Sequence, residues 1–266
     1  MASWASLSRR RRTIVLRRIA YSVSLVIVVV VGFVIDWVSL SDSMIRPSII
    51  VDQFPRIVTV AARNTLIFTF FGFVGGLMIG LVVALGRISQ ARPFRIASGV
   101  FVDVIRGIPL LVWILIIGFG IPIATGVRIP GAYGAGSLAL AIVAGGYMAE
   151  TIRSGIEAVP RGQMEAARSV GMTYTRAMWT IVLPQAFRII IPPLTNELVL
   201  LIKDTSLVSV LGVTAGTIEL TKFGRSASAT AFNATPLITA ALVYLAITLP
   251  MIRVVAILEK KAAASR

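Results

Sequence analysis

Six long apolar stretches, separated by polar and basic segments, organise this chain of 266 residues. A helix needs roughly 20 predominantly apolar residues to cross the hydrocarbon core of a membrane. Stretches of about this length cover residues 19–37, 64–86, 100–123, 135–152, 186–202 and 236–258. The fifth is short and contains Pro192 and Pro193, which are expected to kink or break its helix. The pattern predicts an all-α integral membrane protein with about six transmembrane helices.

Composition supports this class and excludes several others. Apolar residues make up 57% of the chain and charged residues only 14%, with a mean hydropathy of +0.90. Soluble domains have about 45–50% apolar and about 25% charged residues, so this surface needs lipid as its solvent. The absence of cysteine and histidine from the sequence excludes disulfides, zinc–thiolate sites and imidazole bases. The net charge is +15, but the basic residues flank the apolar stretches and do not cluster in one groove. Nucleic-acid binding is therefore not expected.

The basic residues predict how the chain crosses the membrane. With the N-terminus inside, 18 of the 26 Lys and Arg residues lie on the inner side and 6 on the outer side, while Arg106 and Lys203 lie at or within spans. The positive-inside rule then places both termini, segment 1–18 and tail 259–266, in the cytoplasm. Contact with lipid headgroups is an alternative role for the basic N-terminal segment. Stretch 19–37 is expected to remain as a helix, because no small-x-small cleavage site follows it.

The polar segment between the fourth and fifth stretches, residues 154–185, is too long for an ordinary connection. Structureless loops beyond about 12–15 residues are uncommon and usually functional. The sequence predicts two short helices here, at about 161–170 and 173–182. Gly171 suits the left-handed cap that ends the first helix. Thr173 suits the N-cap of the second, which is expected to stop before Pro184.

One face of the first short helix carries Met164, Ala167 and Val170 at helical spacing. Small and flexible side chains of this kind suit insertion into a groove of a partner protein. An amphipathic helix pair that lies on the lipid headgroups is an equally good interpretation. The residues by themselves leave both interpretations open.

A signature within this segment resembles the EAA motif of the permeases of bacterial ABC importers. It consists of Glu165, Ala166 and Ala167, then Gly171, then Ile181, Leu183 and Pro184. The resemblance implies the transmembrane-domain fold of type I ABC importers for residues 64–258. It also implies that 154–185 is a coupling loop that docks on an ATPase subunit, with Glu165, Ala166, Ala167, Gly171 and Pro184 as its characteristic residues.

Three further motifs are similar to the polar amino-acid branch of this family, which includes histidine, glutamine, glutamate and arginine permeases. They are Arg106-Gly107-Ile108-Pro109-Leu110-Leu111, with Ile108 in place of the usual Thr, the stretch 146–153, and Lys203-Asp204-Thr205-Ser206-Leu207. Permeases of this branch often have five spans, so the helix at 19–37 is interpreted as an addition.

The resemblance implies a transport subunit and not an enzyme, with polar amino acids as its substrates. It implies a multi-pass protein of the bacterial cytoplasmic (inner) membrane. The implied partners are two ATPase subunits, a second permease subunit that is a copy or a paralogue, and an extracytoplasmic substrate-binding protein. ATP and Mg are expected on the ATPase, since this chain has no P-loop, and the chain is expected to hold no cofactor or metal. The competing class is a channel, or an enzyme that uses Ser206 and Lys203.

Polar side chains within spans are costly, so they face protein or water and are candidates for the transport pathway. The fifth stretch and its end supply Asn196, Glu197, Lys203, Thr205 and Ser206. Opposite charges close together suit an amino acid, which carries a carboxylate and an ammonium. An ion pair between Glu197 and Lys203 is the structural alternative.

Other polar and small residues have more than one interpretation. Glu150 is either a gate or the partner of Arg153, three residues on. Arg106 is either a pore-lining residue or an anchor whose side chain reaches the membrane interface. Asn64 is expected to cap the second span. Close helix packing is expected at Gly72, Gly75, Gly76 and Gly80.

Overall fold

The computed structural model describes residues 9–34, 36–131, 133–212 and 214–264. Every regular element in these ranges is a helix. Five helices are long and apolar enough to cross a membrane, and a bent pair counts as a sixth crossing. The five cover Thr13–Val34, Ile57–Ile88, Gly134–Glu157, Tyr174–Val210 and Thr235–Ala262. The prediction of an all-α protein with about six spans is confirmed.

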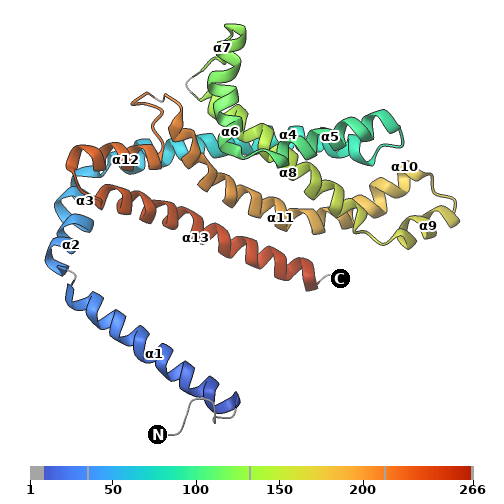
Figure 1. Cartoon of the computed structure of the whole chain (residues 1–266). Helices are drawn as coiled ribbons and strands as arrows, with labels where there is room; N and C mark the ends of the chain where they lie inside the picture. Colours follow the sequence, from blue (N-terminus) through green and yellow to red (C-terminus); the bar gives the residue numbers. More distant parts are fainter. Residues whose placement is uncertain (1–8, 35, 132, 213, 265–266) are drawn as a thin grey trace.

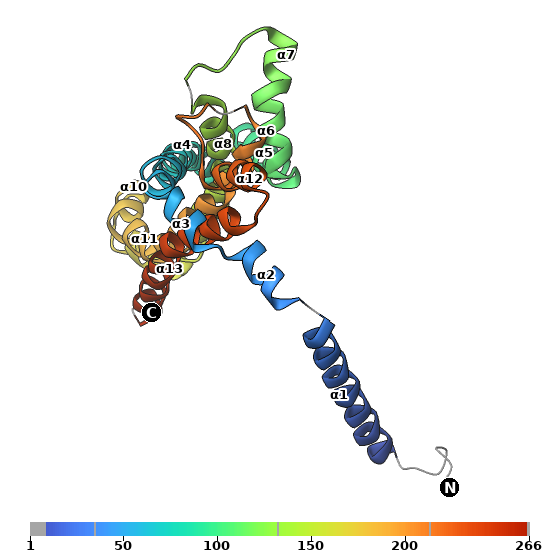
Figure 2. The same ribbon diagram turned by 90° about the vertical axis from the view of Figure 1, so that its left-hand side faces the viewer.

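The centre of the bundle is the contact between α4 (Arg63–Ile88) and α8 (Gly134–Glu157), which lie side by side in Figures 1 and 2. Glycines allow this approach. A Cβ atom on Gly76 would lie 2.8 Å from the Cβ of Ala144, and one on Gly80 would lie 2.8 Å from the Cβ of Met148. Since no side chain fits at such distances, the predicted close packing through glycines is confirmed, and it occurs within one chain.

The third predicted span is not one straight helix. The chain bends by 101° between α5 and the helices that follow it, as Figure 1 shows. These elements are α5 (Arg92–Gly107), α6 (Leu110–Leu115), η3 (Ile116–Gly120) and α7 (Ile121–Thr125). A residue before proline avoids the helical region, and Ile108, before Pro109, is extended with φ −108° and ψ 132°. The expectation of a continuous helix over 100–123 is therefore wrong.

The fifth span is longer and less interrupted than predicted. It consists of α10 (Tyr174–Ala177), η4 (Met178–Val182), α11 (Leu183–Asp204) and η5 (Thr205–Val210). The predicted stop before Pro184 is wrong, because the π-helical η4 leads directly into α11 and the chain stays helical through this proline. α11 is also not broken at Pro192 and Pro193. The Thr195 hydroxyl donates to the carbonyl of Ile191 at 2.8 Å and supports the turn that follows.

The N-terminal helix α1 (Arg9–Val34) stands away from the other helices in Figures 1 and 2. No residue of its most apolar 18-residue window is buried. Two short helices, α2 (Trp37–Met44) and α3 (Pro47–Gln53), join it to the bundle. They are tied to the start of α13 (Thr235–Ala264) by a hydrogen bond from the Arg46 amide to the Thr235 hydroxyl, 2.9 Å long. Residues 1–8 of the basic N-terminal segment lie outside the described residues.

Asn64 does not cap the second span, because the π-helical η2 (Ile57–Ala62) already precedes α4. Its buried amide instead donates to the carbonyls of Gly216 and Ile218, both at 2.9 Å, and accepts from the Tyr133 hydroxyl at 2.7 Å. The cap prediction is wrong for this reason. Asn64 thus holds two connections against α4, at the end of the bundle where α12 (Leu220–Ala231) lies.

The same end of the bundle contains a fully buried carboxylate. Glu219 precedes α12 (Leu220–Ala231) and accepts from the amides of Thr221 and Lys222 at 2.7 and 2.5 Å. Burial raises the pKa of the Glu219 carboxyl, whereas these hydrogen bonds act in the opposite direction. Each carboxylate oxygen has a backbone donor, so Glu219 acts as a helix cap.

Candidate functional site

The 154–185 segment forms the end of the bundle opposite α12, where Figure 1 shows α9 and α10. α9 covers Arg161–Ser169, and Gly171 after it has a φ of +86°. The Thr173 side chain accepts from the amide of Arg176 at 3.3 Å and caps α10. Both predicted short helices and their caps are therefore present, although the second continues into α11. We call this end of the molecule the α9 end.

The face of α9 that was predicted to meet a partner protein or lipid headgroups packs largely against the chain itself. Met164 packs on a cluster of the chain's own apolar side chains, and Ala167 is buried, with 3% of its surface exposed. That cluster contains Ala84, Val102, Ala149, Ile152, Val159, Val182, Ala186 and Ile190. Met164 and Ala167 therefore do not offer a face to a partner protein, because the adjacent helix ends already cover it. Spacing within one helix cannot reveal which neighbour covers a face.

The outer surface of the α9 end carries several residues of the signature. Glu165, Ala166 and Pro184 are exposed, and Val170 is 78% exposed. Gln185 donates to the carbonyl of Ile181 at 2.9 Å and lies 3.4 Å from the side-chain oxygen of Gln163, which links α9 to the start of α11. The inner face of α9 is thus fixed by contacts with the chain's own helices, and its outer face is exposed, as a docking element requires.

Glu150 is the centre of an ion-pair network at the base of this segment. Arg153 forms the predicted pair with Glu150 through its Nε at 3.0 Å and a second, shorter contact, and it also pairs with Glu157. Arg87, at the end of α4, lies 3.4 Å from Oε2 of Glu150, the same oxygen that accepts from Nε of Arg153. This contact of Arg87 was not predicted, because 63 positions separate Arg87 from Glu150 and no local pattern relates them.

A polar cavity of about 480 Å³ lies between the α5–α6 bend, α8 and α11. Its charged and aromatic lining consists of Arg106, Tyr147, Glu197 and Asp204. The guanidinium carbon of Arg106 lies 5.3 Å from the centre of the Tyr147 ring, within the range of a cation–π contact. The bend at Ile108 and Pro109 contributes to the wall, so the missed break in the third span shapes this cavity.

The cavity brings together only some of the predicted pathway residues. Arg106 and Glu197 line it, and so does Asp204, which the sequence placed only within a motif. Glu197 and Asp204 are seven positions apart and share a face of α11. Lys203 is exposed on another face, and among the described residues no ion pair joins it to Glu197. The structural alternative of a Glu197–Lys203 pair is therefore wrong in this structure.

The remaining predicted pathway residues lie outside the lining of this cavity. Asn196 is exposed on α11, and Ser206 is half-buried. Thr205 is fully buried, and its hydroxyl donates to the carbonyl of Ile202 at 2.7 Å. Glu150 lies one turn beyond Tyr147 along α8, toward the α9 end. Tyr147 was missed as a wall residue, because the sequence does not show which neighbour it faces.

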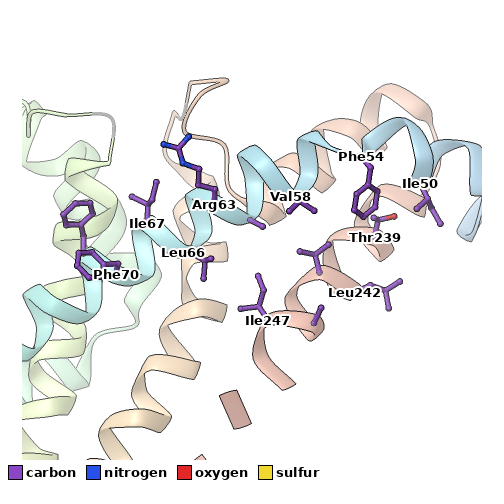
Figure 3. A pocket seen from close by; sticks show the side chains of 14 residues that line it. Ile50, Phe54, Val58, Arg63, Leu66, Ile67, Phe70, Thr239, Leu242 and Ile247 are labelled. Carbon is purple, nitrogen blue, oxygen red and sulfur yellow. The ribbon is translucent and has the colours of Figure 1, made fainter. Parts of the chain in front are cut away.

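A larger groove of about 900 Å³ lies between the start of α4 and α13 and has a different character. Figure 3 shows that apolar side chains such as Leu66, Leu242 and Ile247 line it, with Arg63 at its edge. None of the predicted site residues belongs to this lining. An apolar groove on a membrane helix is compatible with lipid, so the polar cavity is the better candidate for a solute.

Comparisons with known proteins identify the class of this molecule. Residues 76–264 match the family model described as "Binding-protein-dependent transport system inner membrane component". A "Probable glutamine ABC transporter permease protein" of Bacillus subtilis is 40% identical over 198 residues, which are 74% of this chain and 89% of that protein. The arginine transport system permease of the same organism is 35% identical over 187 residues, 70% of this chain and 83% of that protein.

A solved structure of an amino acid ABC transporter with histidines has the same fold. It matches with a TM-score of 0.72 and 34% identity, covering 85% of this chain and 99% of that one. The family model alone spans well over half of the sequence. This chain therefore belongs to the family of inner-membrane components of binding-protein-dependent transport systems, as a multi-pass membrane subunit with a transport role and no catalytic one.

Proposed function

We propose that this chain forms the transmembrane pathway of an ABC importer for polar amino acids in the bacterial cytoplasmic membrane. It works beside a second permease subunit, either a copy or a paralogue. Two ATPase subunits bind ATP and Mg at the α9 end, and an extracytoplasmic binding protein delivers substrate at the opposite end. The observation that carries the proposal is a charged cavity between α5, α8 and α11 combined with an exposed EAA segment on α9.

The geometry of the α9 end supports docking of an ATPase. Glu165 and Ala166 are exposed on α9, whereas Ala167 is buried and Met164 packs on a cluster with side chains from α4, α5, α8 and α11. A force applied to the outer face of α9 therefore reaches four spans through packed side chains. Close-packed interiors transmit such displacements because they have little free volume.

The polar cavity supports binding of an amino acid. The guanidinium in the cavity wall can bind a substrate carboxylate through paired hydrogen bonds. The two carboxylates in the wall can accept hydrogen bonds from a substrate ammonium. Arg106, Glu197 and Asp204 provide these groups around one space of about 480 Å³. The matched relatives are named for glutamine and arginine, which share an α-carboxylate and an α-ammonium. We expect this common part of the substrate to occupy the cavity.

Uptake of radiolabelled amino acids into proteoliposomes that contain the complete complex tests the proposal. The account predicts accumulation that requires ATP, the ATPase subunits and the binding protein. Competition by unlabelled glutamine, arginine, histidine and glutamate identifies the carried amino acid. Accumulation without ATP would indicate a channel and would contradict the proposal.

A further inference from the structure

The ion pair between Arg87 and Glu150 connects helices that are distant in sequence. Arg87 is in the last turn of α4, and Glu150 is on α8, with 3.4 Å between Nη2 and Oε2. Both side chains are 24% exposed. A pair that is largely shielded from water interacts more strongly than one on an open surface. Its geometry is therefore able to fix the relative position of the two helices.

The third participant in this contact is α5. A Cβ atom on Gly99 would lie 2.9 Å from Nη1 of Arg87, so the guanidinium lies close to the backbone of α5 at this glycine. The Nε of Arg87 is buried without a hydrogen-bond partner among the described residues. The desolvated guanidinium thus depends on Glu150 for compensation. Arg87, in the last turn of α4, thus lies against both α5 and α8.

Charged and aromatic residues continue from this point along one face of α8. Tyr147, Glu150, Arg153 and Glu157 follow one another at spacings of three, three and four residues, which places them on a common stripe. At one end of the stripe, Tyr147 contacts Arg106 in the wall of the polar cavity. At the other end, Glu157 is the last residue of α8, shortly before α9 begins at Arg161.

We propose that Arg87 is a positioning residue that couples the ATPase-docking segment to the substrate cavity. It ties α4 and α5 to the α8 stripe, so that a displacement of α9 moves α5 and the Arg106 at its end. The inference rests on the proposed function, because it needs both an ATPase at α9 and a substrate in the cavity. Arg87 touches neither of them and acts through Glu150.

The test compares ATPase activity with and without substrate-loaded binding protein in the reconstituted complex. Arg87→Met is expected to lower the ratio of stimulated to basal activity about fivefold, and Arg87→Lys to restore part of it. Arg92→Met is the matched control, because Arg92 is exposed at the start of α5 and has no carboxylate partner among the described residues. The control is expected to keep the wild-type ratio.

Two further measurements separate coupling from a merely structural role. In a double-mutant cycle, the effects of Glu150→Gln and Arg87→Met are expected to be less than additive, because both remove the Arg87–Glu150 pair, while Glu150→Gln also weakens the contact with Arg153. Glu150→Gln also tests the inference if Arg87→Met does not assemble. A lower melting temperature with an unchanged ratio, or equal effects of Arg87→Met and Arg92→Met, would overturn the inference. Absence of stimulation in the wild-type complex would instead contradict the proposed function.

Discussion

The guanidinium of Arg106 lies over the ring of Tyr147, 5.3 Å from its centre, and joins α5 to α8 at the wall of the polar cavity. Such a contact contributes about 0.5–2 kcal/mol, depending on desolvation. We predict that Tyr147→Leu raises the KM of uptake severalfold, because Arg106 loses the surface that orients it toward a carboxylate. Tyr21→Leu on the exposed helix α1 is the control and should leave KM unchanged. Equal KM values for both variants would argue against this role of Tyr147.

The two carboxylates of the cavity make a separate prediction. Glu197→Gln and Asp204→Asn keep the shapes of the side chains but remove the charges that face a substrate ammonium. Each variant is expected to reduce the initial rate of uptake at least tenfold, since a hydrogen bond to a charged group contributes about 1.5–3 kcal/mol. Asp52→Asn, at an exposed position outside the cavity, provides the comparison. Wild-type rates in both cavity variants would exclude direct contact of these residues with the substrate.

Cross-linking can test whether the α9 end of the molecule is the end that meets the ATPase subunit. The chain contains no cysteine, so a single introduced cysteine is unique. Val170→Cys, at a position 78% exposed after α9, should cross-link to the ATPase subunit in the assembled complex. Phe232→Cys, at a position 95% exposed at the opposite end, should not. Cross-linking of the ATPase to position 232 would reverse the proposed orientation.

Packing of α4 on α8 depends on glycine at defined positions. Gly76→Val should prevent assembly or lower the melting temperature of the purified subunit strongly, because even a Cβ atom there would lie 2.8 Å from Ala144. Gly32→Val on α1 adds the same side chain where no atom lies within 4 Å. We expect that control to behave as wild type. A Gly76→Val protein as stable as the control would show that the two helices can separate without cost.

Helices and spans could be predicted from the sequence because lipid exposure dictates their apolar length. The break at Pro109 could have been predicted, since a residue before proline avoids the helical region. It was missed because residues 100–123 form one long apolar stretch. At Pro192 and Pro193 the error was the opposite, because a break was expected where the helix continues. Their effect depends on what replaces the lost hydrogen bonds, and α11 continues through both.

The candidate site was only partly predictable for a related reason. Local sequence signals were sufficient to predict the helix cap at Gly171, which has a positive φ, and the ion pair of Glu150 with Arg153. The contact of Glu150 with Arg87 spans 63 positions, and a single sequence does not show such a contact. The inward face of α9 was likewise misassigned, because packing of Met164 depends on helices that the segment's own sequence does not specify.

The most direct test of the account is substrate-stimulated ATPase activity of the complete complex carrying Glu165→Lys or Gly171→Pro. Glu165 is exposed on α9, and Gly171 has a φ of +86° that proline cannot adopt. We predict that either change abolishes stimulation and uptake while the subunit still inserts into the membrane. Glu259→Lys, an equal charge reversal at an exposed position on α13, should retain both. Normal stimulation in both α9-end variants would contradict the claim that this segment couples the permease to its ATPase.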